Sequence, residues 1–189
     1  MPAAQSLTGK TGTKIVKTDL VSTRKSAATR VGVAAGKIGK FVFAKGHAPD
    51  YAAYFKAAPL DRVTFVKTGV PADQAKAFLT HLDAPSHRLY EALDLKVSTF
   101  NRKALKKDFL SADEAERVMG LVKLFGQVET MVQESGNSEG FDPAVWTLRW
   151  LEEPLPALGG RTPMELMDTM EGQTLVSDTL AKVQSGAYA

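Results

Sequence analysis

The sequence contains no cysteine, so disulfide bonds, thiolate zinc sites and cysteine nucleophiles are all excluded. It also has no apolar run near the ~20 residues that a membrane-spanning helix needs. Its basic first residues lack the apolar stretch of ~7–15 residues found in a secretory signal peptide. We therefore expect a cytoplasmic protein that makes no contact with a membrane.

Side chains suited to catalysis are scarce as well. The three histidines, His47, His81 and His87, show no metal-ligand spacing and have no paired carboxylates beside them. No serine–histidine–aspartate set or carboxylate pair for acid–base chemistry can be argued from the sequence. The sequence therefore predicts a protein that is not an enzyme. We expect no catalytic residue, metal, cofactor or small-molecule substrate.

Charge, in contrast, is abundant and unevenly distributed. Residues 1–67 hold 12 Lys/Arg and three acids, a net charge of +9. Residues 108–189 hold five Lys/Arg and 14 acids, a net charge of −9, so the overall charge is only +3. This gradient is compatible with two surfaces for different partners, a basic one for nucleic acid and an acidic one for a basic protein. A solvated tail joined to an acidic helical surface would give the same numbers.

The first 45 residues have few large apolar side chains, and no periodicity marks a strong helix or strand. We interpret residues 1–67 as a basic, partly flexible N-terminal extension. Within it, Asp50–Ala58 is compatible with a short helix that ends before Pro59. Residues 60–66 are compatible either with a short strand or with the start of the next domain.

From Pro71 onward, apolar residues recur at helical spacing. Residues 68–110 are expected to form a helix-turn-helix domain with helices over Ala72–Leu82 and Ser86–Leu93 and a third helix capped by Ser98. In the third helix, Phe100, Ala104 and Leu105 should point into the core. The polar residues that should face outward are Asn101, Arg102, Lys103, Lys106 and Lys107.

Such a third helix suits the major groove of DNA, because asparagine can bind adenine and basic side chains can bind guanine or phosphate. An ordinary helical bundle with a basic, solvated face would have the same pattern. The residues predicted to bind DNA are Ser98, Thr99, Asn101, Arg102, Lys103 and Lys106.

Residues 111–189 are expected to form a second helical domain. Ser111 and Glu114 form a capping box for a long helix that runs to about Glu134. Asp142-Pro143 starts the next helix, which carries Trp146 and Trp150 on one face and ends before Pro154. A capping box at Thr162–Glu165 starts a short helix, which Gly172 should break before a last helix over residues 173–184.

The segment Gly159–Pro163 lies in the loop before that short helix. Free backbone amides at a helix N-terminus can bind an anion. The same segment can instead be a rigid loop that presents Arg161 to a protein, or a tight turn that needs the positive φ of glycine. The sequence alone leaves these alternatives open.

The last two-thirds of the chain resemble the Xre/MbcA/ParS family of antitoxins, and most closely Xre of the RES–Xre pairs. The resemblance rests on Trp150-Leu151, Pro154 and the run Ala157–Leu166 (Ala-Leu-Gly-Gly-Arg-Thr-Pro-Met-Glu-Leu), followed by Gly172, Val176, Leu180 and the terminal Gly186-Ala187-Tyr188-Ala189. The chain departs from the family pattern at Leu155, where asparagine is usual. The third helix also has Asn101-Arg102-Lys103 where relatives often have an Arg-Arg pair.

The resemblance implies an all-α protein, with a Cro/Xre-like helix-turn-helix bundle followed by a helical toxin-binding domain. It implies a type II antitoxin that forms a homodimer, assembles into a higher-order complex with a RES-domain toxin that degrades NAD, and represses its own operon by binding operator DNA. The residues expected to contact the toxin are Trp150, Leu158, Gly159, Gly160, Arg161, Thr162, Pro163, Gly186, Tyr188 and Ala189. The alternative is a stand-alone helix-turn-helix transcriptional regulator.

Overall fold

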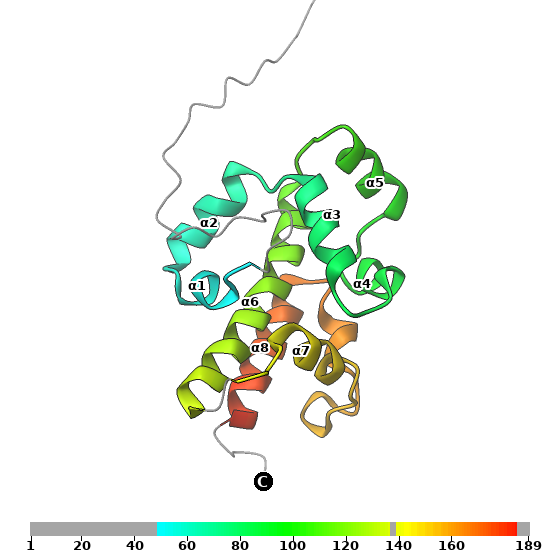
Figure 1. Cartoon of the computed structure of the whole chain (residues 1–189). Helices are drawn as coiled ribbons and strands as arrows, with labels where there is room; N and C mark the ends of the chain where they lie inside the picture. Colours follow the sequence, from blue (N-terminus) through cyan, green and yellow to red (C-terminus); the bar gives the residue numbers. More distant parts are fainter. Residues whose placement is uncertain (1–48, 137–138, 185–189) are drawn as a thin grey trace, which may run out of the picture. The chain divides into compact units, whose positions relative to one another are not determined.

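The computed structural model describes residues 49–136 and 139–184, which belong to one compact unit, Gly32–Ala189 (Figure 1). The basic, partly flexible extension is predicted for residues 1–67, and its residues 1–48 lie outside the described residues, as do Gly186, Tyr188 and Ala189. Every regular element within the described ranges is helical, and an isolated bridge joins Pro71 to Phe109. The all-α prediction is therefore confirmed. No helix in these ranges has the length and apolar character needed to cross a membrane.

Two helices precede the predicted helix-turn-helix. Asp50 caps α1 (Tyr51–Lys56) by accepting a hydrogen bond from the Ala53 amide at 2.8 Å. Pro59 occupies the first turn of α2 (Pro59–Thr68), where its missing N–H costs nothing. The short strand considered for residues 60–66 is therefore wrong, because these residues are helical.

The next three helices form the helix-turn-helix: α3 (Ala72–His81), α4 (Ser86–Ala92) and α5 (Val97–Leu105). Their shared core includes Leu79, Leu89 and Phe100, each at most 1% exposed. Ser98 is not the cap of α5, because the N-cap position is Lys96 and no side chain caps this end. The inward orientation predicted for Leu105 is also wrong, since its side chain is 83% exposed at the last turn.

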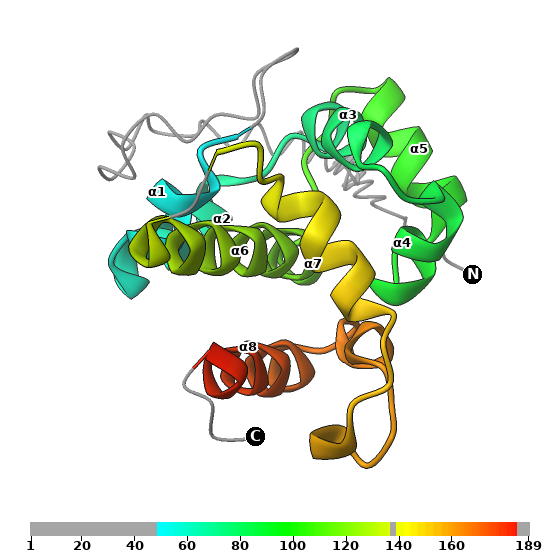
Figure 2. The ribbon, with the colours of Figure 1, turned by 60° about the horizontal axis from the view of Figure 1, so that its bottom comes forward.

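The long helix α6 (Ala112–Ser135) runs through the middle of the described fold and contacts α1, α2, α7 and α8 (Figure 2). The predicted capping box is present: Ser111 accepts from the Glu114 amide, and Glu114 accepts from the Ser111 amide. Gly126 allows α1 to approach closely, because a methyl group there would collide with the carbonyl oxygen of Tyr51. The ring of Tyr51 packs edge-on against Phe125 at 5.3 Å.

The C-terminal part consists of α7 (Pro143–Leu151), the short 3-10 helices η1 (Pro156–Leu158) and η2 (Pro163–Leu166), and α8 (Met170–Gln184). The predicted break at Gly172 is wrong, because α8 begins at Met170 and Gly172 lies in its first turn. A side chain at this position would collide with the Leu166 carbonyl oxygen. Glycine is needed here for a close approach between η2 and α8.

Candidate functional site

The outer face of α5 is the first candidate surface. The ring of Phe100 is buried and packs against Tyr90 of α4 at 5.4 Å, which fixes the rotation of α5 about its axis. Ser98, Arg102 and Lys106 are all exposed and follow one another at spacings of four residues. That spacing places them on a single face of the helix. Thr99 is half-buried beside them.

Lys103 and Asn101 do not share this outward orientation. Lys103 Nζ forms an ion pair with the carboxylate of Glu114, and the two side chains are 22% and 11% exposed. Burial disfavours the charged form of Glu114, but hydrogen bonds from Lys103 and Ser111 outweigh it and hold the pKa below its usual value. Asn101 is half-buried, and its Oδ1 has no hydrogen-bond partner among the described residues. The outward orientation predicted for Lys103 is therefore wrong: it joins α5 to α6.

Arg117 is a structural residue that the sequence analysis did not single out. Its Nε donates to the Leu93 carbonyl at 2.7 Å and its Nη2 donates to the Asp94 carbonyl at 3.1 Å. Asp94 has a φ of 44° in the turn between α4 and α5. A side chain of α6 therefore satisfies two carbonyls of the helix-turn-helix turn. Spacing gives no sign of this contact, because 23 residues separate Asp94 from Arg117.

The loop 155–163 is the second candidate surface. The Leu155 amide donates to the Arg161 carbonyl, and the Gly160 amide donates to the Leu155 carbonyl, both at 3.0 Å. Gly159 and Gly160 have φ values of 68° and 83°. No atom lies within 4 Å of a Cβ built at either position, so these glycines are required by conformation and not by space. The tight-turn interpretation of this segment is confirmed.

Arg161 projects from this turn into solvent. It is exposed and makes no ion pair or side-chain hydrogen bond with any residue of the described ranges. Directly after it, Thr162 and Glu165 form the predicted capping box, with Thr162 Oγ1 donating to Glu165 Oε1 at 3.1 Å, and Pro163 is buried. The Glu165 carboxylate already accepts a hydrogen bond from the Thr162 amide, so this amide is not available to bind an anion. The geometry favours a rigid loop that presents Arg161.

Two other residues of the predicted toxin contact lie differently. Trp150 is only 6% exposed and stacks on Trp146, with 6.3 Å between the ring centroids and 9° between the planes. Trp146 is the exposed member of the pair at 39%. Leu158 is half-buried in η1. Trp150 thus packs inside the domain and supports the segment before the loop, while Trp146 offers the accessible ring.

Direct contacts join α4 and α6 to the C-terminal part of the fold. Arg88 of α4 pairs with Glu152, just after α7, at 2.9 Å. Gln173 of α8 donates to the carbonyls of Arg117 at 3.1 Å and Met167 at 2.9 Å. Arg117 therefore binds the helix-turn-helix turn through its side chain and the C-terminal part through its backbone. No group of three or more acidic or histidine side chains in the described ranges could hold a metal ion.

Comparison with known families identifies both parts of the fold. A family described as "Antitoxin Xre-like helix-turn-helix domain" matches residues 61–123. A second, described as "Antitoxin Xre/MbcA/ParS C-terminal toxin-binding domain", matches residues 139–186. These matches include α2 to the first half of α6 and α7 to the end of α8, respectively.

Two curated proteins are similar to the chain over different lengths. A protein of Sphingobium sp. (strain YBL2) named "Prs ADP-ribosylating antitoxin" is 49% identical over 146 residues, which are 77% of this chain and 92% of the relative. "Antitoxin Xre" of Pseudomonas putida is 27% identical over 77 residues, which are 41% of this chain and 43% of that protein. Both are named as antitoxins, in agreement with the expectation that the chain is not an enzyme. The chain therefore belongs to the Xre/MbcA/ParS family of toxin–antitoxin antitoxins, with an Xre-like helix-turn-helix domain followed by a C-terminal toxin-binding domain.

Proposed function

We propose that this antitoxin neutralises a cytoplasmic RES-domain toxin that consumes NAD, by covering the active-site cleft of the toxin with the loop 158–163 and the terminal residues Gly186, Tyr188 and Ala189. The observation that carries the proposal is the exposed, unpaired guanidinium of Arg161 on a turn fixed by two positive-φ glycines. A rigid loop loses little conformational entropy when it binds, so its contacts contribute more fully to affinity.

Charge supports the same proposal. NAD carries a negatively charged diphosphate, so a cleft that binds NAD needs basic or other anion-binding groups. Residues 108–189 have a net charge of −9, and the exposed side chains of Glu152 and Glu153 lie shortly before the loop. An acidic inhibitor surface can compete with the dinucleotide for those basic groups.

The reaction of the toxin is a separate question. The name of the Sphingobium relative refers to ADP-ribosylation of Prs. Hydrolysis of NAD and transfer of ADP-ribose to a protein both break the bond to nicotinamide, and both need an open cleft for NAD. We retain NAD hydrolysis as the proposed reaction. Labelled ADP-ribose on a protein in toxin-expressing cells would replace it with transfer, while the blocking role of the antitoxin would stay the same.

Substitution of Arg161 tests the neutralisation directly. Growth and NAD content are measured in cells that express the adjacent toxin gene with the wild-type antitoxin, Arg161→Ala or Arg149→Ala. Arg149 is an exposed arginine of α7 in the same domain, so its variant is the matched control for loss of charge. We expect Arg161→Ala to restore growth less well than Arg149→Ala. Equal rescue by the two variants would exclude the loop as the inhibitory surface.

We further propose that the antitoxin represses its own operon as a homodimer that binds DNA through Ser98, Thr99, Arg102 and Lys106. The exposed face of α5 supports this proposal, and Lys103 is left out of the contact because its half-buried side chain is paired with Glu114. A stand-alone regulator would not need the toxin-binding domain that matches residues 139–186.

DNA binding is tested with a fragment from upstream of the operon at several salt concentrations. Loss of one phosphate contact in Lys106→Ala should lower the slope of log Kd against log salt by about 1. The exposed Lys67 of α2 supplies the control, since Lys67→Ala should leave the slope unchanged. If Lys106→Ala binds with the wild-type slope, α5 does not face the DNA backbone at this position.

A further inference from the structure

Trp146 is the largest exposed apolar side chain in residues 139–184, and two other rings hold it in place. Its plane lies 9° from that of Trp150, with 6.3 Å between the ring centroids. The ring of Phe141 lies 6.4 Å away at an angle of 45°. Trp150 is buried and Phe141 is half-buried, so both neighbours are themselves anchored in the fold. The structure therefore presents a rigid indole, 39% exposed, on the outer face of α7.

Charged side chains flank this ring along the exposed face of α7. Asp142 precedes Trp146 by four residues and Arg149 follows it by three, and both are exposed. These spacings place the two charged groups beside the ring on one side of the helix. An apolar centre with a polar rim is the usual anatomy of a protein–protein interface. Tryptophan is also among the residues most enriched at binding hot spots.

The toxin contact of the proposed function is too small to hold a partner by itself. It comprises the loop 158–163 and three terminal residues, whereas a stable interface uses ~20–30 residues and ~800 Å² on each protein. Further contacts are therefore needed from the rest of the toxin-binding domain, which matches residues 139–186. Trp146 lies in this range, on the helix that leads into the loop 155–163 (Figure 2). Only roughly 8 Å of helix separates it from Leu151, the last residue of α7.

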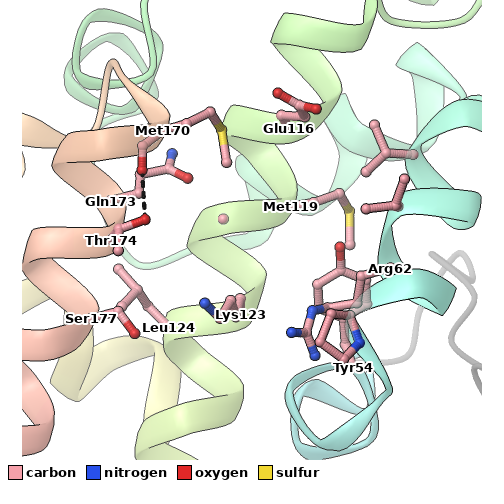
Figure 3. A pocket seen from close by; sticks show the side chains of 14 residues that line it. Tyr54, Arg62, Glu116, Met119, Lys123, Leu124, Met170, Gln173, Thr174 and Ser177 are labelled. Carbon is pink, nitrogen blue, oxygen red and sulfur yellow. Dashed lines mark hydrogen bonds between the residues drawn. The ribbon is translucent and has the colours of Figure 1, made fainter.

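Met170 of α8 is an apolar side chain of similar exposure in the same domain, at 46%. It lines a groove of about 250 Å³ that it shares with residues of α2 and α6 (Figure 3). Both of those helices precede the toxin-binding domain in the chain. Unlike Trp146, Met170 has a flexible side chain that no aromatic stack holds in place. It therefore provides a matched control for the loss of exposed apolar surface.

We propose that Trp146 anchors the toxin by inserting its indole into an apolar pocket of the toxin surface, outside the cleft that the loop 158–163 covers. Phe141 and Trp150 already fix the ring, so little conformational entropy is lost when it becomes buried. Asp142 and Arg149 stay at the solvated rim, where charges contribute little to affinity. Trp146 thus supplies affinity, and the loop supplies inhibition. This inference rests on the toxin neutralisation of the proposed function and adds a residue to its interface.

Calorimetric titration of the purified full-length antitoxin with a catalytically inactive toxin measures this contribution. Trp146→Ala should weaken binding by about 30-fold or more, as expected for a hot-spot residue. Met170→Ala should bind within about fivefold of the wild type, because it removes apolar surface away from the anchor. Circular dichroism confirms that each variant is folded.

A second measurement follows the wild-type ring and needs no substitution in the interface. The chain has only two tryptophans, so labelling the antitoxin with 5-fluorotryptophan gives two fluorine NMR signals, which Trp146→Phe and Trp150→Phe assign. A soluble gadolinium chelate should broaden the signal of the exposed Trp146 more than that of the buried Trp150. When unlabelled toxin is bound, the Trp146 signal should shift and become protected from the chelate.

A folded Trp146→Ala variant with wild-type affinity would overturn the anchor. A Trp146 signal that stays unshifted and accessible in the complex would overturn it as well. If the wild type binds the toxin while either result is obtained, only the anchor fails and the proposed neutralisation stands. A wild-type antitoxin that does not bind the toxin would overturn both.

Discussion

The outer face of α5 and the loop 155–163 both project charged side chains into solvent, but different forces hold their backbones. The helix α5 is fixed by burial, above all of Phe100, and by the ion pair between Lys103 and Glu114. The loop buries little and depends on short-range backbone hydrogen bonds and on two glycines in left-handed conformations. We therefore expect the proposed DNA-binding face to be disrupted by substitutions in its core, and the proposed toxin-binding loop to be disrupted by substitutions that change its backbone conformation.

The largest expected effect concerns the core of α5. Phe100→Ala removes a fully buried ring and should lower the free energy of unfolding by about 3–5 kcal/mol. Leu105→Ala on the same helix is the control, and it should change stability by less than about 0.5 kcal/mol because the side chain is 83% exposed. Urea denaturation followed by circular dichroism measures both. Similar losses for the two variants would contradict the orientation of α5, which buries Phe100 and exposes Leu105.

The attachment of α5 to α6 should depend on pH. The pKa of Glu114 is lowered in the fold, so its stabilising effect is fully present above the ordinary value of 4.5 and is lost as the pH falls through the folded value. Glu114→Gln should lower the free energy of unfolding by about 1–3 kcal/mol at pH 7. The difference from wild type should shrink as the solution becomes more acidic.

The matched control is Asp113→Asn, an exposed acid in the same first turn of α6. It should cost less than Glu114→Gln at pH 7, since Asp113 makes neither the capping-box contact nor the bond to Lys103. Unfolding by urea is measured at several pH values. A Glu114→Gln penalty that is constant with pH would show that the carboxylate charge is not what joins the two helices.

Local patterns in the sequence predict most of the helices, because caps and apolar spacing act over a few residues. The capping boxes at Ser111 and Thr162 and the Asp142-Pro143 start are all present as predicted. The predictions for Leu105 and Gly172 are wrong because the surroundings of these residues are set by tertiary structure. Leu105 lies at a helix end beyond the core, and Gly172 is needed for a contact with η2 that periodicity does not reveal.

The candidate site shows the same division between local and long-range information. The turn at Gly159-Gly160 follows from local chemistry, since only glycine adopts positive φ without strain. The inward path of Lys103 depends on Glu114, and the role of Arg117 depends on carbonyls more than 20 residues away. Long polar side chains can turn to either side of a helix, so their partners are known only when the neighbouring helices are in place.

A substitution in the loop 155–163 is expected to change stability least and to affect toxin binding most selectively. Gly160→Ala forces a residue with a side chain to adopt a φ of 83°, at a cost of about 1–2 kcal/mol. Because the turn carries Arg161, we expect the loop to move and toxin affinity to fall.

Gly140→Ala is a matched control: its φ is 71° and its Cβ would also meet no atom within 4 Å. Gly140 lies before α7, outside loop 155–163, so its variant should show a similar loss of stability with unchanged toxin binding. Calorimetric titration of each antitoxin with a catalytically inactive toxin measures the affinity. If both variants lost affinity equally, general destabilisation would explain the effect; if neither did, the conformation of the Arg161 loop would not determine toxin recognition.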